Sequence, residues 1–153
     1  MIVKLVQAEG PRTYVAVLDK GDETVTSLTR FAAEQEIGAA SITAIGAFSR
    51  GTIGYFDRVT KDYDRIRIDE QVEVLSLVGD IAIADDGPKL HAHVVLGRRD
   101  GSARGGHLLE GFVWPTLEVV ITQAPVHLRR RTDPETGLPL IDLGDAPEQR
   151  SDP

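Results

Sequence analysis

The residues best suited to chemistry in this sequence are two histidines spaced two apart, His91 and His93. Side chains of residues i and i+2 leave a β-strand on the same face, so these two imidazoles project together, roughly 7 Å apart along the strand. Their apolar neighbours point to the opposite face. A pair of imidazoles on one face of a strand supplies two ligands for a divalent metal ion.

A third histidine, His107, returns toward this pair through a hairpin predicted at Asp100-Gly101. If these two residues form the centre of a two-residue turn, His107 pairs with Val94. If the loop has three or five residues centred on Asp100, His107 pairs with His93 and shares its face. Three imidazoles with a free coordination position are typical of zinc sites that accept water or a ligand. The alternative is a polar strand surface that binds no metal.

Several other polar residues are candidates for the same site. Glu110, three residues after His107, is the one candidate catalytic group, because a carboxylate there could orient a ligand or activate metal-bound water. Its alternative is a solvated or salt-bridged side chain. Glu73 faces either the histidines or the solvent. We expect His127 on the surface, and Arg129–Arg131 at a solvated edge or in salt bridges between subunits rather than in a nucleic-acid patch.

Composition restricts the class of protein. The chain has 153 residues, enough for one domain with a core, and no cysteine, which excludes disulfides, iron–sulfur clusters and thiolate zinc sites. The net charge of −7 opposes unaided binding to DNA or to anionic membranes. No apolar run approaches the about 20 residues of a spanning helix, and charge comes too early for a signal peptide. These features predict a cytoplasmic protein without a membrane partner.

The elements that must position the histidines are mostly strands. Alternating or apolar segments bounded by turn residues predict strands at 2–8, 13–18, 40–48, 51–57, 63–69, 71–78, 80–84, 89–97, 115–123 and 126–131. One helix is predicted, with Asp22 as its N-cap and Gly38 as the left-handed residue after its end. One helix beside many strands predicts an α+β domain whose sheet is partly covered.

Three further segments have weaker signals. Residues 108–111 are typical of a helical turn, and the polar segment 144–153 predicts a disordered tail after a domain spanning 1–143. The segment Phe112–Pro115, with the only tryptophan, Trp114, belongs either to the core or to a subunit interface.

The order of these motifs resembles a known family. Gly105-Gly106-His107-Leu108-Leu109-Glu110-Gly111, following His91-Ala92-His93 and the Asp100-Gly101 turn, is similar to the signature of the PPC domain, also called DUF296. Other segments resemble the family in the same order, over roughly residues 10–142: Arg12-Thr13-Tyr14, Lys20-Gly21-Asp22, Ala40–Phe48, Gly54–Asp57 and Glu73–Gly79.

The resemblance implies a PPC-like fold, with a mixed, mostly antiparallel sheet flanked by helices and assembled as a homotrimer. It also implies, as in some prokaryotic members, a metal bound by the histidines at positions 91, 93 and 107. Plant members carry an AT-hook that binds DNA. This sequence has no Arg-Gly-Arg-Pro core, so we expect no DNA binding by this chain alone.

We therefore expect a stand-alone PPC domain that binds zinc or another divalent metal, with a small ligand as a possible further partner. A non-enzymatic, possibly regulatory, role is favoured. Two alternatives stay open: a zinc-dependent hydrolase or lyase that uses metal-bound water with Glu110 as the base, and a DNA-associated protein like the plant relatives. The sequence names no substrate.

Overall fold

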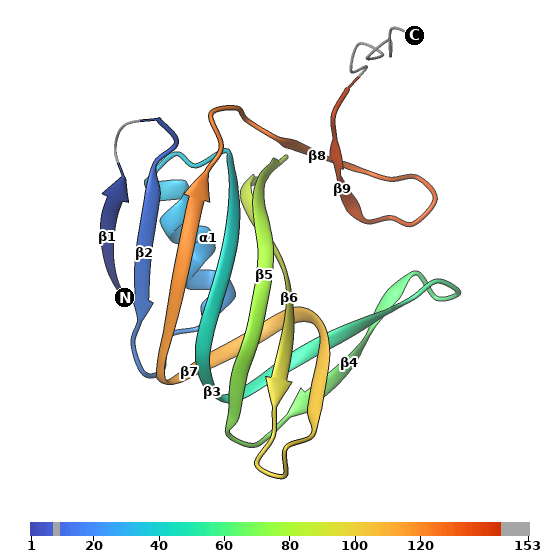
Figure 1. Ribbon diagram of the computed structural model, residues 1–153. Helices are drawn as coiled ribbons and strands as arrows, with labels where there is room; N and C mark the ends of the chain where they lie inside the picture. Colours follow the sequence, from blue (N-terminus) through green and yellow to red (C-terminus); the bar gives the residue numbers. More distant parts are fainter. Residues whose placement is uncertain (8–9, 145–153) are drawn as a thin grey trace, which may run out of the picture.

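The computed structural model describes residues 1–7 and 10–144, and Figure 1 shows the path of the chain. Within these residues the chain forms one helix, α1 (Thr24–Glu34), and nine strands. The strands are β1 (Ile2–Gln7), β2 (Thr13–Leu18), β3 (Ala39–Asp57), β4 (Asp62–Ile68), β5 (Val72–Ala84), β6 (Gly87–Gly97), β7 (Ala103–Gln123), β8 (Arg129–Thr132) and β9 (Pro139–Asp142). The tail predicted for 144–153 lies, from residue 145 onward, outside the described residues.

The nine strands of the described residues form one sheet in the order β1-β2-β7-β3-β5-β8-β9, with β4 paired to β3 and β6 paired to both β5 and β7. Every pairing is antiparallel except that of β8 with β5, which is parallel. The mixed, mostly antiparallel sheet is therefore confirmed. The expectation of several flanking helices is wrong, because α1 is the only helix in the described ranges and lies on one face of the sheet (Figure 1).

Three strands are longer than the sequence predicts. β3 continues through the break expected at 49–50, β5 continues through Gly79, and β7 includes the segment 108–111 that was expected to turn. Gly79 is a point of close packing, since a Cβ there would lie 2.3 Å from the carbonyl oxygen of His91 on β6. Glycine marks turns and close strand approaches alike, so the sequence pattern alone does not separate the two.

The helix begins one residue later than predicted. The N-cap is Glu23, whose carboxylate accepts hydrogen bonds from the backbone N–H groups of Val25 and Thr26 at 3.1 and 2.7 Å. Asp22 instead accepts a bond from the backbone N–H of Asp19 at 3.0 Å. Glu23 therefore caps the helix with a longer side chain than Asp. The prediction of Asp22 followed the usual preference for Asp at this position.

The helix also ends differently from the prediction. The left-handed residue is Glu36, with φ of 53°, rather than Gly38. The absence of a Cβ at Gly38 instead lets the exposed ring of His127 pack against it, since a Cβ there would lie 1.8 Å from Nδ1 of His127. No helix in the described part of the chain has the length and apolar character needed to cross a bilayer.

The core lies between α1 and one face of the sheet. Burial alternates along the strands, so Ile42 and Ala44 of β3 are buried while Thr43 and Ile45 face away from the core. β3, β5, β6 and β7 also pair in a closed circuit, with Phe48 fully buried. In Figure 1 the helix lies behind the sheet, and the viewer faces the open side.

Candidate metal site and adjoining pocket

The hairpin between β6 and β7 brings the third histidine onto the first two. A loop of residues 98–102 connects the strands, and Gly101 has φ of +82°, a left-handed conformation that glycine adopts at little cost. His107 pairs directly with His93. Of the two registers that the sequence allowed, the one with a longer loop centred on Asp100 is therefore confirmed.

The three imidazoles form a compact group. One ring nitrogen from each of His91, His93 and His107 lies within 4.8 Å of the others, and the ring centroids are 5.1 to 5.4 Å apart. Histidine nitrogens coordinate zinc at about 2.0–2.1 Å, so nitrogens around one ion are about 3.3 Å apart in a tetrahedral site. Small side-chain rotations bring the three rings to that spacing.

The protonation of the rings suits a metal ligand. Burial, followed by repulsion from His91 and His93, lowers the pKa of His107 to about 4, so this ring is neutral near pH 7. Burial and then the charge of Arg130 lower the pKa of His91. Nδ1 of His107 is buried without a hydrogen-bond partner, and an uncompensated buried nitrogen costs free energy. A metal ion would give such a nitrogen a partner, so the residues present fit one.

An aromatic ring holds His107 in place. Tyr63 of β4 stacks on His107 with a centroid distance of 4.7 Å and an interplanar angle of 26°. Tyr63 in turn meets Phe56 edge to face, at 5.4 Å. The stack restricts the rotation of the imidazole, which preorganises a ligand. No sequence pattern indicated Tyr63, because β4 pairs with β3 and lies near β7 only where the end of β3 pairs with both strands.

A partly buried ion pair, between Asp80 and Arg130, lies next to His91. Asp80 of β5 lies opposite His91 of β6, and its carboxylate is 3.7 Å from Nδ1 of that ring. The same carboxylate accepts a hydrogen bond from Arg130 of β8, whose side chain is only 5% exposed. Arg130 also donates to the carbonyl oxygen of Pro139 at 3.0 Å.

The arginine run therefore differs from its prediction. Arg129 and Arg131 are exposed, but Arg130 is buried, because alternate residues of a strand face opposite sides. Arg131 forms an ion pair with Asp142 at 3.0 Å, which joins β8 to β9. The pairing of β8 with β5 brings Arg130 to Asp80. No signal in the sequence predicts that pairing.

Two predicted carboxylates lie outside the histidine group. Glu110 accepts hydrogen bonds from Arg65 at 3.2 Å and Thr52 at 3.4 Å. Glu73 is exposed and pairs with Gly97 at the far end of β6. The catalytic role predicted for Glu110 stays a prediction, although its salt bridge corresponds to the simpler alternative.

Two other singled-out residues also lie elsewhere. His127 is exposed, as expected, but in the connection before β8 rather than in a strand. Trp114 is 37% exposed, with the ammonium group of Lys20 3.6 Å from its ring centroid, so it does not belong to the core of the subunit.

A pocket of about 280 Å³ adjoins the histidines. His91 and His107 lie at one end, beside Arg130. Its remaining walls are Tyr63, Lys89, Leu90 and residues 138–140 of the β8–β9 hairpin. The hairpin thus contributes both a buried cation and an apolar wall to the surroundings of the histidine group.

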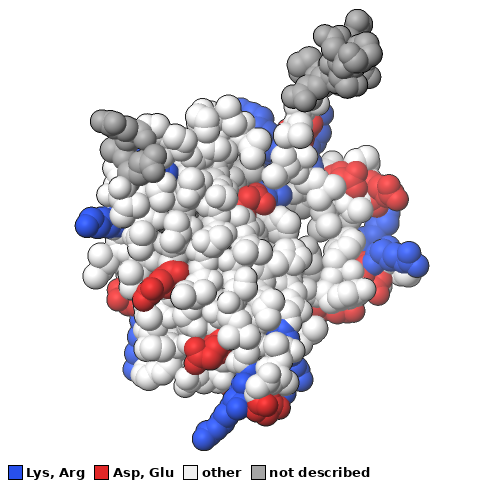
Figure 2. All heavy atoms as spheres, viewed as in Figure 1, with Lys and Arg blue, Asp and Glu red and all other residues white. Residues whose placement is uncertain are grey.

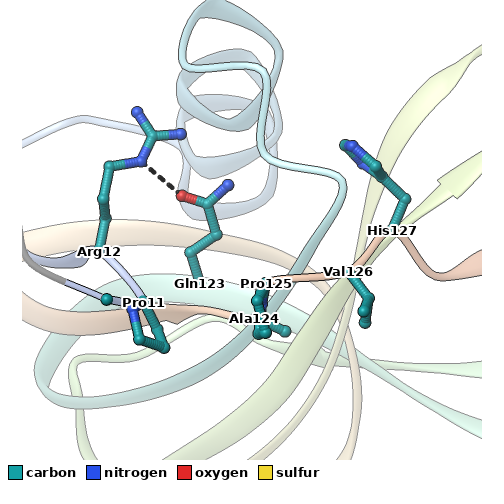
Figure 3. Close-up of a pocket in the computed structure, with 8 residues that line it drawn as sticks. Pro11, Arg12, Gln123, Ala124, Pro125, Val126 and His127 are labelled. Carbon is teal, nitrogen blue, oxygen red and sulfur yellow. Dashed lines mark hydrogen bonds between the residues drawn. The ribbon is translucent and has the colours of Figure 1, made fainter.

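A second hollow, of about 220 Å³, lies near the end of α1 and is drawn in Figure 3. Arg12 donates to the side-chain oxygen of Gln123 at 2.7 Å across this hollow, and the ring of His127 lies on its other side (Figure 3). In the part of the chain that the structure describes, only the group of His91, His93 and His107 has the spacing of a metal site.

Comparisons with known proteins agree with this geometry. The model of the Plants and Prokaryotes Conserved (PCC) domain family matches residues 6–125. A plant- and prokaryote-conserved (PPC) protein of Pyrococcus horikoshii is 31% identical, with a TM-score of 0.81, and the match covers 92% of this chain and 94% of that one. No protein with a curated description matches.

Two other solved structures are similarly close. A protein of Bacteroides thetaiotaomicron described as a candidate DNA-binding protein is 31% identical, with a TM-score of 0.84 and coverage of 92% of this chain and 96% of that one. A metal-containing protein of Archaeoglobus fulgidus is 34% identical, with a TM-score of 0.80 and coverage of 92% and 98%.

Proposed function

We propose that this chain, a member of the Plants and Prokaryotes Conserved (PCC, also written PPC) domain family, binds a divalent metal ion through His91, His93 and His107. The sequence motifs predicted this family. The observation that carries the proposal is the convergence of three imidazole nitrogens within 4.8 Å of one another. The similar protein of Archaeoglobus fulgidus, described as metal-containing, supports it.

We propose zinc as the metal. Imidazole is a preferred ligand of zinc, and sites with three protein ligands leave a fourth position for water or another ligand. When bound, the ion would act as a Lewis acid at that position. The neutral state of His107 near pH 7 means that no proton must leave this ring before the ion binds.

We favour a binding role over hydrolysis. The carboxylate expected to act as a base, that of Glu110, is in an ion pair with Arg65. Asp80, the carboxylate beside His91, accepts a hydrogen bond from Arg130. Each of these carboxylates is therefore engaged by an arginine side chain. The cytoplasmic location stays a prediction.

Calorimetric titration of zinc into protein stripped with a chelator tests the metal site. One ion should bind per chain, and His93→Ala should weaken binding by more than the about 10–100-fold that the loss of a supporting outer residue costs. His127→Ala, which removes an exposed imidazole elsewhere, is the matched control and should leave the affinity unchanged. Absence of binding, or an unchanged affinity in His93→Ala, would contradict the proposal.

We further propose that the domain assembles as a homotrimer through the open face of its sheet. Large apolar side chains are exposed on β3, β5, β6 and β7 on this face: Ile45, Leu75, Val78, Val95 and Val120. Figure 2 shows the same side as mostly uncharged, with a few isolated acidic side chains and with Lys and Arg toward its margin. Contiguous exposed apolar surface of this kind is typical of an interface.

His93 adjoins this face through the strand register. His93 pairs with Val78 of β5, which pairs with Thr43 of β3, which pairs with Val120 of β7. Directly paired residues of neighbouring strands share a face. A subunit seated on the apolar residues would therefore adjoin the histidines. A cyclic trimer needs an interface of two different surfaces that closes after three copies.

We propose that this chain alone does not bind DNA. One similar structure is described as a candidate DNA-binding protein, but affinity for DNA rests mainly on cationic contacts to phosphates. This chain has 17 Lys and Arg against 24 Asp and Glu. The middle arginine of its basic run, Arg130, has a side chain only 5% exposed, so it offers no surface charge to a DNA backbone.

A further inference from the structure

We propose that the pocket beside the histidines binds a small organic carboxylate, whose charged head lies toward Arg130 and the metal position and whose apolar part packs on the β8–β9 hairpin. The proposal rests on the metal site proposed above and names the ligand class of that site. Its experiment is therefore arranged so that failure of the metal site and failure of carboxylate binding give different results.

The charges around the pocket favour an anion. Among the described residues, its lining contains two cationic side chains, those of Lys89 and Arg130, and no acidic one. The counter-charges of these two cations, Asp86 for Lys89 and Asp80 for Arg130, do not line the pocket. With three neutral imidazoles as ligands, a divalent ion would keep its full double charge. An anion beside Arg130 is attracted by both centres.

Arg130 is built into the site rather than exposed on the surface. Its side chain is 5% exposed, and two of its nitrogens donate to Asp80 and to the carbonyl oxygen of Pro139. The third, Nε, is buried without a partner. An unused donor on a buried guanidinium is costly, and a carboxylate would reach Nε once the neighbouring side chains shift to expose it. A carboxylate is the acceptor that matches guanidinium geometry best.

The rest of the pocket favours an organic ligand over an inorganic one. Leu138, Pro139 and Leu140 of the hairpin form an apolar wall of the pocket. Inorganic phosphate would leave this wall exposed to water, whereas a short hydrocarbon chain would cover it at a gain of about 0.8 kcal/mol for each buried CH₂ group. The volume of about 280 Å³ is at the lower end of ligand pockets, which limits the ligand to a small molecule.

The hairpin is the element that sets this preference. The family model matches residues 6–125, which include the three histidines, whereas β8 and β9 follow this range. The matched part of the chain thus supplies the metal ligands. The hairpin supplies Arg130 and the apolar wall, so it decides which molecule reaches the metal.

The test uses hexanoate, hexanol and inorganic phosphate as probes of the full-length protein. Zinc content is measured first by elemental analysis, and each probe is then titrated into the zinc-loaded protein and followed by NMR or calorimetry. Hexanoate should bind, hexanol should bind at least about tenfold more weakly because it lacks the charge, and phosphate should bind at least about tenfold more weakly because it lacks the chain.

Substitutions on the hairpin locate the binding. Leu140→Glu places a negative charge on the pocket wall and should weaken hexanoate binding at least about tenfold through repulsion. Leu143→Glu adds the same charge at an exposed position outside the pocket and is the matched control, with an expected change of less than about twofold. Both positions are exposed enough to accept a charge without unfolding: Leu140 is 45% exposed and Leu143 is 72% exposed.

The outcomes separate the two proposals. Protein that holds zinc but binds none of the probes overturns the carboxylate proposal and leaves the metal site intact. Equal binding of hexanoate and hexanol, or of hexanoate and phosphate, also overturns it. Equal effects of Leu140→Glu and Leu143→Glu would show that hexanoate binds elsewhere. Protein that holds no zinc overturns the proposed function itself.

Discussion

Acidification should destabilise the metal-free protein through His107. The folded state holds the pKa of this ring at about 4, against an ordinary value of 6.5 in the unfolded chain. Between these values the unfolded chain binds a proton that the folded chain does not, so the free energy of unfolding decreases as the pH falls. This contribution is fully present above pH 6.5 and is lost as the pH falls through 4.

The magnitude follows from the two pKa values. Lowering the pH from 7.5 to 4.5 would remove at most about 2.5 kcal/mol through this one group, from the linkage relation. Water reaches part of the ring and screens the charge, which reduces the expected loss to roughly half of that figure. His107→Gln removes the titrating group, so its stability should depend less on pH by about 1 kcal/mol over the same range.

Urea unfolding of chelator-treated protein at pH 7.5 and 4.5, at one fixed protein concentration, measures this difference. His127→Gln is the matched control. The unfolded chains of His107→Gln and His127→Gln each lack one titrating histidine, so the two variants differ only in the folded state. Identical pH dependence in His107→Gln and His127→Gln would refute the reasoning, since it would mean that His107 titrates alike in the folded and unfolded states.

The remaining predictions concern packing, assembly and DNA. Gly79→Ala should lower the free energy of unfolding by about 1–3 kcal/mol and weaken zinc binding, because the added Cβ would press on the backbone of His91. Gly97→Ala is the control, since its Cβ would meet only the side chain of Leu75, and it should reduce stability and zinc affinity less. Val120→Glu should yield monomers of 16.6 kDa by light scattering where the unaltered protein gives three times that mass, and a monomeric or dimeric unaltered protein would contradict the trimer. The chain should bind A·T-rich duplex no more tightly than the about 10⁻⁴–10⁻⁶ M of non-specific contacts at moderate salt, and sub-micromolar affinity would contradict this.

The sequence predicts the histidine group well because its signal is local. The spacing of His91 and His93 fixes their common face on any strand, and a short hairpin limits His107 to two registers. The strands could also be predicted from local patterns of alternating residues and turns. The family could be predicted from the order of the motifs along the chain. One helix and its approximate span also follow from the period of its apolar residues.

The surroundings of the histidines were not accessible from the sequence. Tyr63, Asp80 and Arg130 come from three different strands and meet the histidines only through pairings between distant segments. Arg130 is the middle residue of a run of three arginines, which a local pattern predicts to be solvated. The parallel pairing of β8 with β5 directs Arg130 toward the protein interior. Long-range register of this kind depends on the whole sheet, which local patterns do not encode.

The most direct test of the metal site is an anomalous difference map, recorded at the zinc absorption edge from crystals of protein purified with zinc. We expect one strong peak per chain, about 2.0–2.1 Å from a ring nitrogen of each of His91, His93 and His107. A map with no peak among these rings, or with its peaks at other residues, would contradict the central claim.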